Sequence, residues 1–154
     1  MERLDLQRYS GLWYEFARTP LFWEVNCDTA TAEYIPNRQG TSLEVINRCY
    51  DGKKQLIDTR RGTATLRNDK TLSLIFDDGR PANPYPAPYI VVETDYRSYS
   101  IVKGTKDAWI LTRDEYPTQQ LIKQVIAICD HHGLNIDEMT ISREKARSVT
   151  QSTL

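Results

Sequence analysis

Short segments in which apolar and polar residues alternate fill most of the first two-thirds of the chain. Eight of them are rich in Thr, Val, Ile and Tyr and are bounded by Gly, Pro, Asn or Asp, a pattern typical of β-strands. They cover residues 13–18, 29–35, 43–50, 62–66, 71–76, 89–94, 99–103 and 108–113. Because no helical pattern separates them, neighbouring strands are expected to pair antiparallel. Eight such strands form either a sandwich or a closed barrel, and closure alone removes both exposed edges.

The side chains that share a strand face indicate what an interior would contain. In the fifth segment the alternate positions Leu74 and Phe76 are large and apolar. In the second segment Ala30, Ala32 and Tyr34 share one face, and the two alanines are small. An eight-stranded barrel has just enough room either to be packed solid or to hold one small ligand. Small inward side chains therefore favour a ligand cavity.

One helix and one further strand are predicted in the last third of the chain. Apolar residues recur at three- and four-residue spacing over residues 118–132, with Pro117 before them and Gly133 just after. His131 and His132 fall in the last turn of this helix. Adjacent helical residues point about 100° apart and seldom bind one ion, so we expect no metal site.

The composition is that of an ordinary globular domain. The 20 basic and 21 acidic residues leave a net charge of −1, so we expect no nucleic-acid partner. The longest apolar run, residues 125–129, is far shorter than the roughly 20 residues of a transmembrane helix. The first five residues lack the apolar stretch of a secretory signal, which predicts a cytoplasmic protein if Met1 is native.

Two of the three cysteines could meet across a hairpin. Cys27 and Cys49 are placed symmetrically about Arg38, which lies in the turn-forming stretch 36–40. A hairpin with that centre would put them opposite each other, close to disulfide geometry. A disulfide and two free, partly buried thiols both remain open, and a disulfide would favour an oxidising compartment. Cys129 falls in the predicted helix and is interpreted as a small core residue.

Three separated motifs resemble those of the lipocalin family. Residues 11–14 read Gly-Leu-Trp-Tyr, similar to the Gly-x-Trp-Tyr motif of the first lipocalin strand. Residues 94–96 resemble the Thr-Asp-Tyr turn, and the arginine that ends the eighth segment resembles the one that packs over the family's tryptophan. The motif residues are Gly11, Trp13, Thr94, Asp95, Tyr96 and Arg113. The likeness runs from about residue 6 to about residue 144 and is closest to the apolipoprotein D and bacterial outer-membrane (Blc-like) lipocalins.

The resemblance implies an eight-stranded antiparallel up-and-down β-barrel with one C-terminal helix packed outside and a short final strand. One domain over residues 1–154 would then hold its barrel at about 10–113, its helix at about 117–132 and its last strand at about 139–142. Trp13 and Arg113 would close one end through a cation–π contact. Glu15 shares the strand face of Trp13 and is expected either to face the interior or to be neutralised by Arg18 or Arg61.

The resemblance also implies a function, which is the non-catalytic binding of a small hydrophobic or amphipathic molecule such as a fatty acid, a lysophospholipid or a sterol-like compound. Trp109 and Tyr34 correspond to pocket-lining aromatic residues of apolipoprotein D-like proteins, and Asn47 lies near a polar pocket position. The expected ligand-binding residues are Trp109, Tyr34, Asn47, Ala32, Leu74, Phe76 and Ala64. Where those relatives carry a carboxylate two positions after Asn47, this chain has Cys49, which suggests a different ligand or a disulfide.

Further expectations follow from the resemblance. The family suggests a secreted, periplasmic or outer-membrane location, with peripheral membrane association as an option and a monomer or weak dimer as the expected state. No cofactor is expected. The sequence contains no Gly-x-Ser-x-Gly, phosphate-binding loop or His-Glu-x-x-His motif, so no catalytic residue is predicted.

Two alternative functions stay open. The first is an isomerase, because a few lipocalins use one interior cysteine for isomerisation, and Cys49 would be the nucleophile. The second is a protein-interaction surface at the open-end loops. The proline-rich connection 81–88, expected as a loop between the fifth and sixth strands, is its best candidate.

Overall fold

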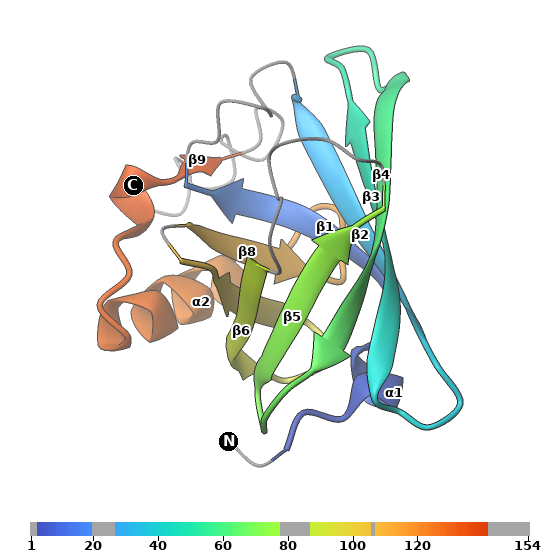
Figure 1. The fold of residues 1–154 in the computed structure, drawn as a ribbon. Helices are drawn as coiled ribbons and strands as arrows, with labels where there is room; N and C mark the ends of the chain where they lie inside the picture. The colour runs from blue at the N-terminus through green and yellow to red at the C-terminus, as the bar shows by residue number, and fades with distance from the viewer. Residues whose placement is uncertain (1–2, 20–26, 78–86, 106, 142–154) are drawn as a thin grey trace.

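Nine antiparallel strands form one sheet in the computed structural model, which describes residues 3–19, 27–77, 87–105 and 107–141. The strands are β1 (Gly11–Arg18), β2 (Thr29–Pro36), β3 (Ser42–Tyr50), β4 (Leu56–Leu66), β5 (Thr71–Phe76), β6 (Ala87–Thr94), β7 (Tyr99–Lys103), β8 (Ala108–Thr112) and β9 (Thr140–Ile141). The helices are α1 (Leu6–Tyr9), α2 (Gln119–His131) and the 3-10 helix η2 (Ile136–Glu138) (Figure 1). Strands β2 to β8 pair in chain order, and β1 pairs with both β8 and β2 and so closes the barrel. The predicted eight-stranded antiparallel barrel with an external helix and an extra strand is confirmed.

Most predicted strands differ from the observed ones by a residue or two, and β4 differs most. It begins at Leu56 rather than at residue 62. Its first half carries Asp58 and Arg60 in the positions that face inward, so the expected apolar alternation is hidden there. Strand β6 includes Pro88, which the sequence placed in a loop, because the first residues of a strand tolerate proline. The rest of that predicted loop, up to residue 86, lies outside the described residues, as does Ser142 of the predicted last strand.

The two ends of the barrel differ. Helix α1 lies at one end, called the base here, and the connection between β3 and β4 lies at the opposite end, called the mouth (Figure 1). Asp5 caps α1, since its Oδ1 accepts hydrogen bonds from the backbone N–H groups of Gln7 and Arg8. A four-residue helix is too short to show a hydrophobic period, which is why α1 was not predicted.

Trp13 and Arg113 close the base. The Arg113 guanidinium carbon lies 3.8 Å from the centroid of the Trp13 ring, and the side chain donates hydrogen bonds to the carbonyl oxygens of Leu12 and Tyr96. Gly11 has a φ of +101°, and a Cβ there would lie 3.2 Å from Arg113 Nη1. A side chain at residue 11 would be strained and would crowd the arginine, which explains the glycine.

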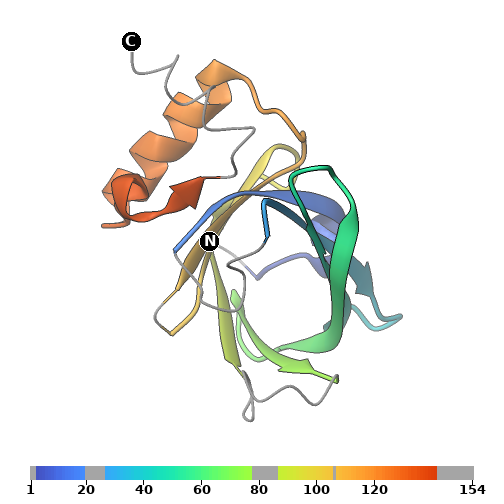
Figure 2. The same ribbon diagram turned by 90° about the horizontal axis from the view of Figure 1, so that it is seen from above.

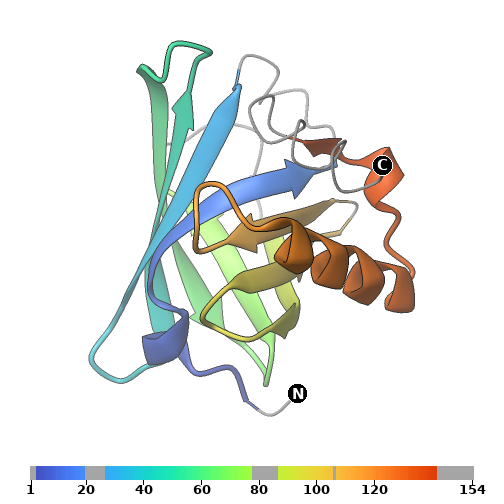
Figure 3. The ribbon, with the colours of Figure 1, turned by 180° about the vertical axis from the view of Figure 1, so that it is seen from behind.

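Two apolar clusters lie on the two sides of the sheet. The inner cluster comprises Leu4, Leu6, Tyr9, Trp13, Ala32, Tyr34, Leu43, Val45, Ala64, Leu72, Val91, Val102 and Leu111. The outer cluster packs α2 on the outer faces of β1, β7 and β8 through Phe16, Ala17, Tyr99, Ile101, Ile110, Ile122, Val125, Cys129 and Ile136. Figure 2 shows α2 outside the ring of strands, and Figure 3 shows it beside β8. The barrel interior is therefore separate from the helix-covered core.

Helix α2 begins and ends as its sequence predicts. The Thr118 hydroxyl accepts a hydrogen bond from the Leu121 N–H at the N-cap, and Gly133, with φ +73°, follows the C-cap residue His132. Within the described ranges, no helix is long and apolar enough to cross a membrane.

Candidate functional site

Three tyrosine hydroxyl groups meet in the base half of the barrel. The Tyr9 hydroxyl lies 2.7 Å from Ser100 Oγ and 3.0 Å from the Tyr89 hydroxyl, which in turn lies 2.6 Å from that of Tyr34. Burial raises the pKa of Tyr9 to about 12 and raises those of Tyr34 and Tyr89 well above their ordinary value. The hydroxyls therefore stay protonated and satisfy one another. The walls around them belong to the apolar inner cluster, so this half presents a mainly apolar surface.

A polar row crosses the inward face nearer the mouth. Ala32, Asn47 and Arg60 are direct cross-strand partners on β2, β3 and β4, so their side chains share the inward face. Arg60 is only 9% exposed as a residue, and its guanidinium carbon lies 3.8 Å from the centroid of the Phe76 ring on β5. Asp58 occupies the next inward position of β4 toward the mouth. The barrel interior thus changes from apolar at the base to charged and polar at the mouth.

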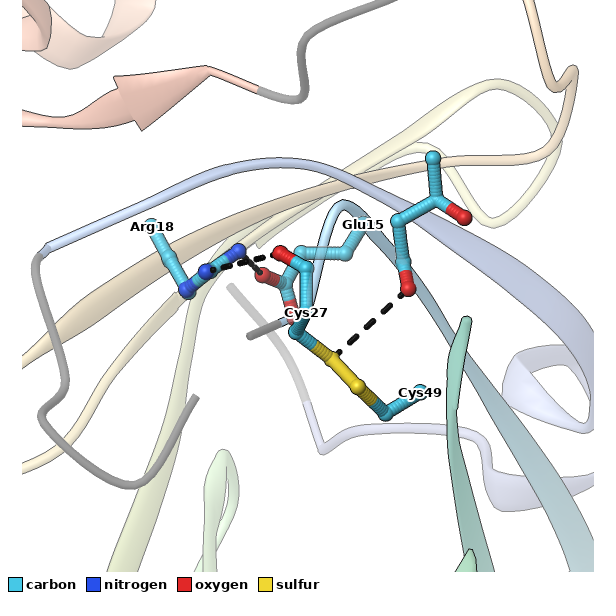
Figure 4. The surroundings of a disulfide bond; sticks show 5 residues. Glu15, Arg18, Cys27 and Cys49 are labelled. Atoms are coloured by element: carbon cyan, nitrogen blue, oxygen red, sulfur yellow. Dashed lines mark hydrogen bonds and ion pairs between the residues drawn. A yellow bond between two sulfur atoms is a disulfide. The ribbon is translucent and has the colours of Figure 1, made fainter. Parts of the chain in front are cut away.

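A buried ion pair lies where β1 reaches the mouth. Arg18 Nη1 donates to Glu15 Oε1 at 2.8 Å, with 8% and 11% of the two side chains exposed (Figure 4). A register shift in β1 after Glu15 places both Phe16 and Ala17 in the outer cluster, while Glu15 stays opposite Leu111 of the inner cluster. Both expectations for Glu15 hold together, because it faces inward and is paired with Arg18.

A disulfide joins the segment just before β2 to the end of β3. Cys27 and Cys49 are bonded, with their Cα atoms 5.4 Å apart, and the Cys27 carbonyl accepts a hydrogen bond from Arg18 (Figure 4). The residue directly opposite Cys49 is Ala30, so the predicted face-to-face register of the two cysteines was wrong. The hairpin ends on the pair Pro36 and Leu43, which puts its centre later in the chain than expected. Cys27 consequently precedes β2 and reaches Cys49 diagonally.

The residues predicted to line a ligand site share the inward face. Ala32, Tyr34 and Ala64 are buried in the inner cluster, and Leu74 and Trp109 pack against it. Asn47 and Phe76 lie next to this group through their pairing with Ala32 and Gly62. Asn47, Leu74, Phe76 and Trp109 face inward yet keep part of their surface accessible to solvent. Side chains on a core face that remain accessible indicate incomplete filling of the mouth half.

Sequence reasoning missed Arg60 and Tyr89 as inward residues. Arg60 lies two and four positions before Gly62 and Ala64, so extending the alternation of β4 toward its start would have found it. Tyr89 lies two positions before Val91 of the inner cluster, and the same rule would have placed it inside.

A separate groove of about 350 Å³ lies outside the barrel, where β1 and β2 part. Strand β2 pairs only with residues 11–14 of β1, whereas the end of β1 pairs with β8 and β9. The groove is lined by Leu12, Tyr14, Thr29, Ala30, Thr31, Glu33, Arg48, Tyr50, Lys54 and Glu115. An ion pair between Arg48 and Glu33, 2.9 Å long, crosses its wall. Its lining is more polar than the barrel interior and includes only one of the inward-facing residues described above, Ala30.

The remaining reactive groups are few. Cys129 is a free thiol on the buried face of α2, and burial raises its pKa to about 11, so it is a weak nucleophile. His132 Nε2 lies 3.4 Å from Glu93 Oε1 on the outer surface. Among the residues that the structure describes, no three His, Cys, Asp or Glu side chains are grouped to hold a metal ion.

Comparison with known proteins points in one direction. The family described as "Lipocalin-like domain" matches residues 4–144. A putative lipocalin R877 of Acanthamoeba polyphaga mimivirus is 30% identical over 148 residues, covering 88% of this chain and 82% of the viral protein. Apolipoprotein D of Mus musculus is 27% identical, with 90% and 76% covered, and the outer membrane lipoprotein Blc of Citrobacter freundii is 26% identical, with 90% and 78% covered.

Solved structures agree on the fold. The major allergen Per a 4 from cockroaches superposes with a TM-score of 0.73 at 24% identity, covering 92% of this chain and 89% of the allergen. Lobster apocrustacyanin A1 superposes with a TM-score of 0.71 at 18% identity, with 88% and 77% covered. The family match over nearly all of the chain, the barrel and its Trp13–Arg113 closure together show that this chain belongs to the lipocalin-like domain family.

Proposed function

We propose that this protein binds one amphipathic lipid inside the barrel, with the tail toward the base and the polar end at the mouth, and that it catalyses no reaction on it. Lipocalins as a family bind small hydrophobic ligands. The observation that supports the amphipathic ligand and its orientation is the division of the inward face into an apolar half and a polar half. Apolar side chains and mutually bonded tyrosines line the base, whereas Asn47, Arg60 and the Glu15–Arg18 pair lie nearer the mouth.

The energetics suit a lipid with a single acyl chain. Burying one methylene group contributes about 0.8 kcal/mol, so a long chain gains roughly 10 kcal/mol before costs. Lost translational freedom and ordering of the chain remove much of that gain, which leaves a dissociation constant on the order of micromolar. Trp109 offers a flat aromatic wall beside Val102, its cross-strand partner on β7.

The isomerase alternative is less well supported than binding. Its nucleophile would be the Cys49 thiolate, and Cys49 is bonded to Cys27. The protein-interaction alternative rests on residues 81–88, most of which lie outside the described residues. Neither alternative has a structural observation in its favour comparable to the graded interior of the barrel.

Tryptophan fluorescence tests the proposal. Titration with oleate should change the emission of Trp109, and the change should be much smaller in Trp109→Phe, which keeps the other two tryptophans, Trp13 and Trp23. Ile75→Ala is the matched control, because Ile75 is adjacent to the inward Leu74 and Phe76 but is 48% exposed on the outer face. The proposal fails if oleate leaves the fluorescence unchanged and does not bind by calorimetry. It also fails if Ile75→Ala weakens binding as much as Phe76→Ala does.

A further inference from the structure

We infer that the groove outside the barrel is a second binding site, and that it takes a small uncharged aromatic molecule with one hydrogen-bonding group, such as a phenol. The Thr31 hydroxyl would bind the polar group, and the rings of Tyr14 and Tyr50 would contact the aromatic ring. The groove lies on the outer face of the sheet, so this inference goes beyond the lipid site proposed for the barrel interior and does not depend on it.

Two small side chains between two large ones give the groove its shape. Thr29 and Thr31 are successive outward residues of β2, since Ala32 faces the inner cluster. Tyr14 of β1 is the direct partner of Thr31, and Tyr50 of β3 is the direct partner of Thr29. These two threonines and two tyrosines all line the groove, and both tyrosines are half-buried. A floor of threonines therefore lies between aromatic side chains from the strands on its two sides.

The floor of the groove contains a hydroxyl group that lacks a hydrogen bond. Thr31 is only 8% exposed, and its Oγ1 has neither solvent access nor a hydrogen-bond partner among the described residues. Unsatisfied buried polar groups are rare in folded proteins because they cost stability. A rotation about χ1 places Oγ1 in the position that Cγ2 now holds, and strand residues have more than one common χ1 rotamer. A ligand in the groove could therefore supply the missing hydrogen bond.

The charges of the lining favour an uncharged ligand. The charged residues of the lining are two basic and two acidic ones. Arg48 Nη1 lies 2.9 Å from Glu33 Oε1, and Lys54 Nζ lies 4.0 Å from Glu115 Oε1. The lining as a whole therefore carries no net charge at neutral pH. An ionic ligand would lose part of its hydration on entering the groove without meeting an excess of opposite charge.

The volume of the groove favours a molecule of one or two rings. About 350 Å³ is near the lower end of the range for small-molecule pockets, which is roughly 300–1,000 Å³. Rigid rings lose little conformational freedom on binding and pair favourably with tyrosine rings, whereas an acyl chain must be ordered at many bonds. A small phenol therefore suits the groove better than the lipid proposed for the barrel interior.

Three compounds that share a 4-methylphenyl ring test the inference on the wild-type protein. They are p-cresol, which carries a hydroxyl, toluene, which carries none, and 4-methylbenzenesulfonate, which is an anion. Titrations followed in ¹H–¹⁵N NMR spectra should shift the signals of Tyr14, Thr31 and Tyr50. We expect p-cresol to bind about fivefold more tightly than toluene, because it gains one hydrogen bond. The sulfonate should bind no more tightly than toluene, and an excess of oleate should leave the affinity for p-cresol unchanged within about twofold.

Three variants assign the site to its residues. Thr31→Val keeps the shape of the side chain and should lower the affinity for p-cresol to that for toluene, while leaving toluene binding unchanged. Without ligand, it should also melt at a higher temperature than the wild type, because it removes the unsatisfied hydroxyl. Thr63→Val is the matched control and should leave the preference for p-cresol intact, because Thr63 is an exposed outward residue of β4 away from the groove. Thr29→Phe fills the floor of the groove and should abolish binding of both compounds.

The outcomes separate this inference from the proposed function. If p-cresol shifts only signals of inward residues such as Ala32 and Trp109, and oleate displaces it, the groove site is overturned while lipid binding in the barrel stands. If oleate does not bind but p-cresol shifts the groove signals, the proposed function fails and the groove site stands. The inference is also overturned if p-cresol and toluene bind equally tightly, if the sulfonate binds most tightly, or if Thr31→Val keeps the full preference for p-cresol.

Discussion

The ion pair between Glu15 and Arg18 makes one point of the barrel wall sensitive to single substitutions. Both side chains are almost fully buried, and their charged groups lie 2.8 Å apart. Removing one partner takes this ion pair away from a buried charge, whereas removing both leaves an apolar surface. Replacing both residues with apolar ones should therefore change the free energy of unfolding little, whereas replacing only one should lower it strongly.

Arg18→Met should accordingly lower the free energy of unfolding by about 3–5 kcal/mol in urea titrations. The double variant Glu15→Leu/Arg18→Met should recover most of that loss. Arg48→Met is the control, since its 2.9 Å pair with Glu33 is about one-third exposed and should be worth less than about 1 kcal/mol. A double variant as unstable as Arg18→Met alone would contradict this account of the pair.

At the scale of the secondary-structure elements, the turn between β6 and β7 depends on the carboxylate of Asp95. Asp95 Oδ1 accepts hydrogen bonds from the backbone N–H groups of Arg97, Ser98 and Tyr99 at 3.1, 2.8 and 3.0 Å, and the Ser98 hydroxyl also donates to this carboxylate. Burial by itself raises the pKa of Asp95, but these hydrogen bonds outweigh it and lower the pKa below its ordinary value. The folded state therefore favours the ionised form.

A depressed folded-state pKa contributes stability that is present above the unfolded-state pKa of about 3.9 and is lost as pH falls through the folded value. Asp95→Asn should thus melt at a lower temperature than the wild type at neutral pH. The difference should shrink in melts recorded at progressively lower pH below about 4. A difference that stays constant from neutral to acidic pH would show that the charge of Asp95 does not stabilise the turn.

The disulfide acts on the element formed by β2 and β3. It closes a loop of 22 residues in the sequence, and a loop of that order should contribute about 3 kcal/mol to stability by restricting the unfolded chain. Cys27→Ser/Cys49→Ser should lose about that amount in denaturant titrations without losing the barrel. Thiol counting in denaturant should find only Cys129 reactive before reduction. Three reactive thiols in protein kept under oxidising conditions would contradict the bridge.

At the scale of the whole molecule, periodicity and turn residues predicted the barrel well because each strand alternates between two environments. Prediction failed where charged residues lie on the inward face of a strand together with apolar ones. The start of β4 carries Asp58 and Arg60 inward, so its alternation is not apolar against polar. The cysteine register failed because the hairpin centre depends on the turn geometry beyond Pro36, which the positions of the two cysteines do not specify.

Only part of the candidate site could be predicted from the sequence, and the reason is related. Trp109, Tyr34 and Leu74 could be assigned inward by alternation and resemblance, and the structure places them on or against the inner cluster. The contact of Arg60 with Phe76 joins residues on two strands, and the mutual bonds of Tyr34 and Tyr89 join residues 55 positions apart. Such contacts arise only from the sheet register, which no local pattern encodes.

The central claim is that a lipid lies inside the barrel with its tail toward the base. NMR on the protein with ¹³C-labelled oleate tests it most directly, through contacts between ligand protons and assigned protein protons. The account predicts contacts from the terminal methyl to Leu43 and Leu72 near the base, and from the carbons next to the carboxylate to Phe76. Contacts confined to Tyr14 and Tyr50 of the outer groove, or the reverse orientation inside the barrel, would contradict it.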